Sequence, residues 1–219
     1  YAYCAWNPVM LVDPDGRDGR IIIGEREGKK TITIQTTIYV KGGENWNATP
    51  NELKTIVDDL NHEALKYKRK KEVDGCIVAF DINFKVWSEG IEMQEGDNTM
   101  TLMNYTKRSA TNGQVITDNT GVFIERLSGN NANINSPDIY TTGLNRHVNR
   151  HACMHEVFHL LGLKDRYTEP NISDKGYERN IMGGNAAYTW KLFEEQYRAY
   201  TNKYSSKENG TYIQKTSIE

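Results

Sequence analysis

Hydrophobic residues recur along the chain with two periods, and these periods predict where strands and helices form. Alternation over residues 31–40, preceded by the short apolar run 21–23, predicts two strands joined by a polar turn. A near-continuous apolar start predicts a strand covered on both faces over 76–87. Three shorter β-rich segments, the second expected at a sheet edge, lie at 100–105, 121–127 and 138–142. Together they predict a twisted, mixed sheet of about five strands.

Three segments have the period of amphipathic helices. The first begins at Thr49-Pro50 with Glu52 two residues further on, an N-terminal capping pattern, and its period predicts a helix to about residue 71. The second covers 144–161. The third carries its aromatic side chains on one face, at Trp190, Phe193, Tyr197 and Tyr200. Strands and helices around one core predict a single α/β domain over 21–219, of the α+β type, with one helix backing the sheet.

Composition places the chain among globular proteins and excludes several classes. Its 219 residues are 37% hydrophobic and 26% charged, and the net charge of -2 provides no overall positive field for nucleic acid. The longest apolar run, residues 76–80, is far shorter than the roughly 20 residues that span a bilayer. Its three scattered cysteines suit neither a disulfide framework nor a cysteine-based zinc site. We therefore expect no nucleic-acid partner and no membrane span.

Histidine is unevenly distributed, because four of the five lie within thirteen positions, at His147, His151, His155 and His159. On the predicted helix they are spaced four residues apart, but each step rises about 6 Å, so one metal cannot bind all four. The pattern H-E-x-x-H places His155 and His159 on one face, where both reach one cation. Glu156 then lies beside the cation, in position to take a proton from bound water. We expect His151 to lie behind the ligands or to face solvent.

The pattern extends to H-E-x-x-H-x-x-G-x-x-D. Gly162, just after the second His, is typical of a residue that ends a helix in the left-handed conformation, and this turn directs Asp165 back toward the metal. Asp165 is thus the candidate third ligand, with Glu178 as the alternative. Two imidazoles and one carboxylate form an ordinary Zn²⁺ ligand set. The same set could bind iron, but Glu156 would then have no obvious role.

A glycine-rich turn around Met182 precedes the last predicted helix. Together with the extended pattern it gives about thirty residues that resemble the metzincin clan of zinc endopeptidases, with the aspartate ligand of the snapalysin-like subgroup. The resemblance implies a zincin-like fold with a small C-terminal subdomain, and hydrolysis of protein or peptide substrates through metal-bound water. It implies that His155, His159 and Asp165 are Zn²⁺ ligands and that Glu156 is the general base. It further implies that Gly162 forms the turn, that Met182 lies beneath the metal as a hydrophobic floor, and that Tyr188 is a catalytic tyrosine.

The first seventeen residues carry a second resemblance. The pattern Tyr-x-Tyr, Asn-Pro and Asp-Pro-x-Gly is similar to the end of the core of bacterial RHS or YD-repeat proteins, which is followed by a variable effector. It implies that 1–20 is a linker and 21–219 an effector or toxin domain of a longer, secreted polypeptide. An upstream repeat shell and a cognate immunity protein are the partners that this origin implies.

Two other functions stay open at this point. A catalytically silent zincin-like binding module would retain the metal without cleaving peptides, and a metal-dependent hydrolase would act on a non-peptide substrate. The side-chain oxygens of Glu169, Asn171 and Asp174 are candidate calcium ligands, but their spacing is not that of an EF-hand.

Overall fold

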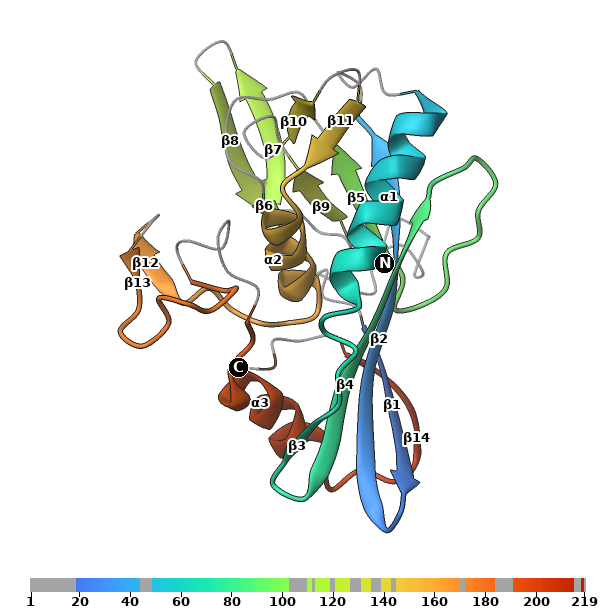
Figure 1. The fold of residues 1–219 in the computed structure, drawn as a ribbon, viewed down its shortest axis with the longest axis vertical. Coiled ribbons are helices and arrows are strands. Elements are labelled where there is room, and N and C mark those ends of the chain that lie inside the picture. The colour runs from blue at the N-terminus through green and yellow to red at the C-terminus, as the bar shows by residue number, and fades with distance from the viewer. Residues whose placement is uncertain are drawn as a thin grey trace, which may run out of the picture.

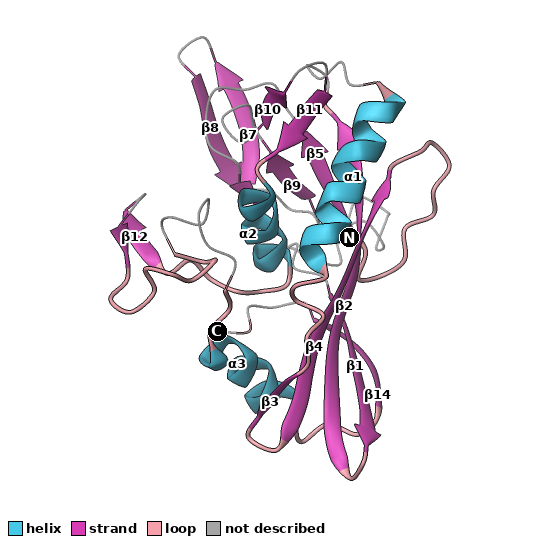
Figure 2. Ribbon diagram, viewed as in Figure 1, coloured by secondary structure: helices cyan, strands magenta, loops and turns pink. Residues whose placement is uncertain are grey.

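The computed structural model is described for residues 19–43, 49–102, 110–111, 113–118, 121–126, 131–134, 139–142, 145–169, 172–183, 191–214 and 218. Within these residues the protein has a mixed α/β fold with three helices and a mixed sheet (Figures 1 and 2). The helices are α1 (Pro50–Ala64), α2 (Arg150–Leu160) and α3 (Glu194–Tyr204). The mixed α/β class follows the prediction, and residues 1–18 of the predicted linker lie outside the described residues.

Among the described residues, eight strands form the main sheet: β1 (Gly19–Arg26), β2 (Lys29–Gly42), β3 (Lys71–Val73), β4 (Cys76–Val86), β5 (Asn98–Leu102), β6 (Ala110–Thr111), β9 (Asn131–Ile134) and β14 (Gly210–Gln214). Three pairs lie outside it: β7 (Gly113–Asp118) with β8 (Gly121–Arg126), β10 (Ile139–Thr142) with β11 (Asn145–Val148), and β12 (Tyr167–Glu169) with β13 (Ile172–Ser173). The prediction of about five strands was therefore too low, because short strands such as β3 and β14 are recognisable only from their partners.

Strand β2 organises the sheet because it is long enough to pair with three neighbours. It runs parallel to β4 on one side, and on the other it is antiparallel to β1 along its first half and parallel to β5 along its last residues. Strands β9 and β6 extend the sheet beyond β5, and β14 extends it beyond β1. Arg20 on β1 forms an ion pair of 2.9 Å with Asp97, the residue before β5, where β5 replaces β1 as the neighbour of β2. The sheet thus has two wings that share β2 and β4 (Figure 1).

Helix α1 begins as the sequence predicts. The Thr49 hydroxyl accepts the N–H of Glu52 at 3.2 Å, and the Glu52 carboxylate accepts the N–H of Thr49 at 2.8 Å, which completes a capping box. Its apolar face packs on β4 and α2. The predicted end near residue 71 is wrong, because the helix ends at Ala64 and strand β3 begins at Lys71. Between them Tyr67 is still buried against the core, while the basic residues around it are exposed.

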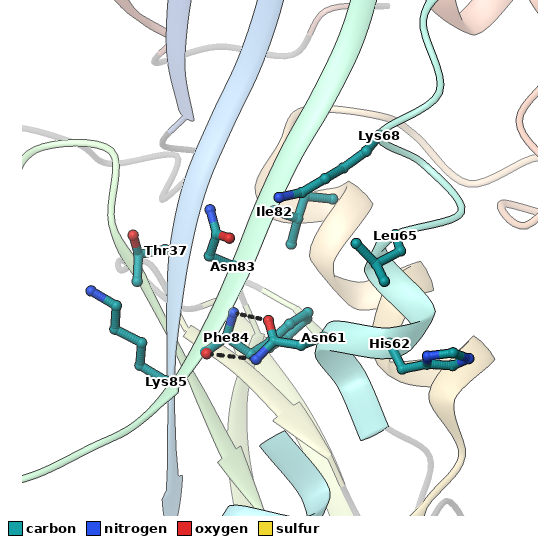
Figure 3. Close-up of a pocket in the computed structure, with 9 residues that line it drawn as sticks. All are labelled: Thr37, Asn61, His62, Leu65, Lys68, Ile82, Asn83, Phe84 and Lys85. Carbon is teal, nitrogen blue, oxygen red and sulfur yellow. Dashed lines mark hydrogen bonds between the residues drawn. The ribbon is translucent and has the colours of Figure 1, made fainter. Parts of the chain in front are cut away.

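Asn61 connects α1 to the edge of β4 (Figure 3). Its Nδ2 donates to the carbonyl of Phe84 at 3.0 Å, and its Oδ1 accepts the N–H of Phe84 at 2.8 Å. The side chain thereby forms hydrogen bonds that a neighbouring strand would otherwise form. A pocket of about 570 Å³ opens beside this contact, with Lys68 and Lys85 in its wall. The described residues that line it include none of the candidate metal ligands, so this pocket is separate from the site below.

The predicted helix over 144–161 is wrong in its first residues. Strand β11 covers Asn145–Val148 and pairs with β10, and α2 begins only at Arg150. Asn149 caps this helix, because its Oδ1 accepts the N–H groups of His151 at 3.2 Å and Ala152 at 3.3 Å. His147 therefore lies on a strand, and the four-histidine ladder does not exist. Helix α2 is buried on most of its surface.

Two other predictions about elements need correction. The segment expected at a sheet edge, 121–127, is strand β8, which pairs with β7 in a two-stranded sheet of its own. The last helix, α3, begins at Glu194, and Trp190 lies outside the described residues. In the described part of the chain no helix combines the length and apolar character needed to cross a membrane.

Candidate metal centre

The end of α2 brings the H-E-x-x-H residues to a turn. Gly162 has φ +92°, its N–H donates to the carbonyl of His159 at 2.9 Å, and the N–H of Leu163 donates to Phe158 at 3.0 Å. This pair of hydrogen bonds is the Schellman motif, which ends a helix at a left-handed residue. A Cβ at position 162 would overlap Nε2 of Gln214. Glycine is therefore required both by the backbone conformation and by the buried neighbour.

After this turn the chain returns to the histidine face, and three side chains converge. His155 Nε2 lies 3.1 Å from His159 Nε2, and Asp165 Oδ1 lies 3.3 Å from the first and 3.1 Å from the second. This group is the one cluster of three or more potential metal-ligating side chains in the described part of the chain. Donors bound to one Zn²⁺ at about 2.0 to 2.1 Å in tetrahedral geometry lie about 3.3 to 3.4 Å apart. The three atoms are thus spaced as zinc ligands are.

Two backbone carbonyls determine which nitrogen of each ring carries the proton. His155 Nδ1 lies 2.7 Å from the carbonyl of Ile181, and His159 Nδ1 lies 2.8 Å from the carbonyl of Leu163. A carbonyl only accepts, so each Nδ1 donates and each neutral ring presents an unprotonated Nε2. The two nitrogens and the carboxylate oxygen therefore direct lone pairs at one another. A cation between them, either a proton on one imidazole or a metal ion, would satisfy these lone pairs, and the three side chains form a group that could hold a metal.

The electrostatics of the three side chains point the same way. Burial acts to lower the pKa of His159, but the hydrogen bond and charge of Asp165, together with the charge of Glu156, outweigh it and raise this pKa. Burial acts to raise the pKa of Asp165, but its contacts with His155 and His159 hold the pKa well below its ordinary value. Both directions are those of a carboxylate paired with a protonated imidazole, and the same negative charge would favour a metal cation in that place.

Access to the centre is uneven. The side chain of His155 is 8% exposed and that of His159 is 18% exposed, whereas that of Asp165 is 42% exposed. Glu156, which follows His155 on α2, is buried. Solvent or a ligand would therefore reach the three donor atoms on the side of Asp165. The side chain of Glu156, the residue after His155, is enclosed by protein.

The glycine-rich turn contributes through its backbone. Met182 is fully buried, and its carbonyl accepts the N–H of Arg166 at 2.8 Å, which joins the two ends of the β12–β13 arm (Figure 1). Ile181, one residue earlier, provides the carbonyl that accepts the Nδ1 proton of His155. The turn thus lies directly behind one candidate ligand.

The other candidates fall outside the cluster or outside the described residues. Glu178 is exposed, and its carboxylate accepts the N–H of Gly176 at 3.1 Å, so the structure brings Asp165 to the histidines and not this alternative. His151 Nδ1 lies 4.0 Å from a carboxylate oxygen of Glu63 on α1 and is not part of the three-residue group. Tyr188 lies outside the described residues, as do Asn171 and the side chain of Glu169 among the candidate calcium ligands.

Sequence reasoning missed one aromatic neighbour of the site. The ring of Tyr167 stacks on that of His155, with centroids 6.2 Å apart and an interplanar angle of 26°. The available signal was position, because Tyr167 comes only two residues after Asp165 and shares its return toward the helix.

Comparison with known proteins adds no family to this description. No protein-family model matches the chain, and no curated protein was found to be similar to it. Two imidazoles, one carboxylate and an adjacent buried glutamate are a set that can bind a divalent metal and move a proton beside it.

Proposed function

We propose that this protein is a zinc-dependent endopeptidase in which His155, His159 and Asp165 hold the metal. The observation that carries the proposal is the convergence of three acceptor atoms 3.1 to 3.3 Å apart, with both histidine tautomers set by backbone carbonyls. Outer carbonyl partners of this kind orient imidazole ligands and raise their basicity. The arrangement is thus suited to a metal centre rather than to an exposed polar surface.

Zn²⁺ bound in such a site lowers the pKa of water and polarises a substrate carbonyl. Glu156 is the residue we assign as general base, because it follows a ligand directly and is buried beside the cluster. It takes a proton from the attacking water and passes it to the leaving amine. Asp165 contributes a negative charge, so Zn²⁺ together with these three ligands would carry a net charge of +1, whereas a three-histidine site would carry +2. We expect the water to be less strongly acidified than in a three-histidine site.

The architecture supports the metzincin resemblance at a coarser level. The chain order places seven strands of the mixed sheet and the backing helix α1 before α2, and the turn around Met182, helix α3 and the eighth strand, β14, after it. The resemblance implies an active-site helix that is followed by such a turn and a last helix. It also implies a glycine turn between the second histidine and the third ligand, and Gly162 forms this turn before Asp165. We extend the proposal to an exported effector domain on the N-terminal resemblance to RHS-associated proteins.

The test combines metal analysis with cleavage. We expect one zinc per chain in the purified protein and cleavage of casein or of a broad peptide library. Glu156→Gln should retain the zinc and cleave about 10² to 10⁴ times more slowly, since general base catalysis contributes about this factor. Glu92→Gln makes the same change at an exposed carboxylate outside the site and should leave both properties unchanged.

Each other result has a clear meaning. Absence of zinc from protein purified without chelators, together with no uptake on addition, would refute the metal centre. Zinc retained without cleavage of any peptide would refute the endopeptidase, and would favour the silent binding module or a hydrolase for a non-peptide substrate.

A further inference from the structure

A buried pair of side-chain amides joins the glycine-rich turn to α3. Asn180 Nδ2 donates to Gln196 Oε1 at 2.6 Å, and Gln196 Nε2 donates to Asn180 Oδ1 at 3.1 Å. Both residues are buried, with 1% and 0% of their surface exposed. Two amides that satisfy each other in this way form a closed polar contact inside an apolar region, where a missing hydrogen bond is costly.

Each amide oxygen also accepts a backbone N–H. Asn180 Oδ1 accepts from Met182 at 2.8 Å, and Gln196 Oε1 accepts from Phe193 at 2.8 Å. The first bond closes the turn upon itself, and the second attaches the pair to the residue that precedes α3. The amide pair is therefore anchored at both ends to main chain.

Ile181 lies between the two anchored positions of the turn. Its N–H donates to the carbonyl of Lys191 at 2.8 Å, and its carbonyl accepts the Nδ1 proton of His155 at 2.7 Å. Because the residues on both sides of it are held, the peptide carbonyl of Ile181 has a fixed direction. The orientation of the His155 ring depends on that direction.

We infer that Asn180 and Gln196 are positioning residues for the metal centre, acting on His155 through the carbonyl of Ile181. The inference rests on the proposed zinc site and goes beyond the resemblance, which assigns no role to either amide. Neither side chain contacts the converging ligand atoms. Their effect is to hold the imidazole Nε2 where the second imidazole and the carboxylate meet it.

A nearly isosteric substitution isolates this role. Gln196→Glu keeps the Oε1 acceptor but replaces Nε2 by an oxygen that faces Asn180 Oδ1, so two acceptors oppose each other. Loss of an outer-shell partner typically weakens metal affinity about 10- to 100-fold. We expect Gln196→Glu to raise the zinc Kd by about 10-fold, measured by competition with a chromophoric chelator, and to change the visible absorption spectrum of the Co²⁺-substituted protein.

The matched control is Gln35→Glu on the sheet. Gln35 Nε2 donates to Asp81 Oδ2 at 2.9 Å, so this variant makes the same chemical change and loses a partly buried side-chain hydrogen bond away from the turn. It should lower thermal stability while leaving the zinc Kd and the Co²⁺ spectrum as in the wild type. A general loss of stability would move both variants alike, whereas a positioning role moves only Gln196→Glu.

Asn180→Asp provides a second variant if Gln196→Glu does not fold. It keeps the acceptor for the Met182 N–H and removes the donor to Gln196, so the same weakening of zinc binding is expected. A folded variant of either kind with wild-type zinc affinity and an unchanged Co²⁺ spectrum would overturn the inference. Failure of the wild type itself to bind zinc would instead refute the proposed function, so the two failures are distinguishable.

Discussion

The substitution Gly162→Ala tests how the turn after α2 is built. Position 162 has φ +92°, a conformation that costs an alanine roughly 1 to 2 kcal/mol. The new Cβ would also overlap Gln214 Nε2, which donates to the carbonyl of Leu161 at 2.6 Å. Displacing this buried side chain adds about 1 to 3 kcal/mol. We therefore expect the free energy of unfolding to fall by about 2 to 5 kcal/mol in urea denaturation.

Gly176→Ala is the matched control, because Gly176 also has φ +92° but its Cβ would meet nothing within 4 Å. It should cost only the backbone term of about 1 to 2 kcal/mol. In the double variant Gly162→Ala, Gln214→Ala the clash is absent, so the two changes should cost less together than their sum. Equal losses for Gly162→Ala and Gly176→Ala would refute the steric argument, and an additive double variant would refute the contact with Gln214.

Two further predictions concern charge. Asp165→Asn should weaken zinc binding by more than about 100-fold, since loss of an outer-shell partner alone costs about 10- to 100-fold. Glu178→Gln should bind zinc as the wild type does. The reverse result would assign the third ligand to Glu178. Burial raises the pKa of Tyr67 and raises that of Tyr204 to about 12. Their stabilising contribution is complete below pH 10, where unfolded tyrosine stays neutral, and each should lose about 1.4 kcal/mol per pH unit as the pH rises from 10 toward 12. Denaturation midpoints that do not fall over this range would contradict the burial.

Local features of the site were predictable because they depend on neighbours in sequence. The spacing of His155 and His159 places both on one face of any helix that contains them, and Gly162 follows at the usual position of a helix end. The capping box at Thr49 is local in the same way. The helical period failed over Asn145–Val148, because pairing with β10 places these residues in a strand.

Contacts between distant segments could not be read from any spacing. Ile181 lies 26 residues from His155 and Gln196 lies 16 from Asn180, so their hydrogen bonds depend on how the turn packs on α2 and α3. The same holds for the eight-stranded sheet, whose wings depend on β2 being shared by three neighbours.

The sequence by itself determined the chemical character of this protein: a helix that carries two histidines and a glutamate, and a glycine that turns the chain after it. Only the tertiary structure decided which carboxylate joins the histidines and which carbonyls set their tautomers. The physical reason is that helix period and capping act over a few residues. Ligand convergence to about 3 Å instead requires elements far apart in the chain to pack in one arrangement.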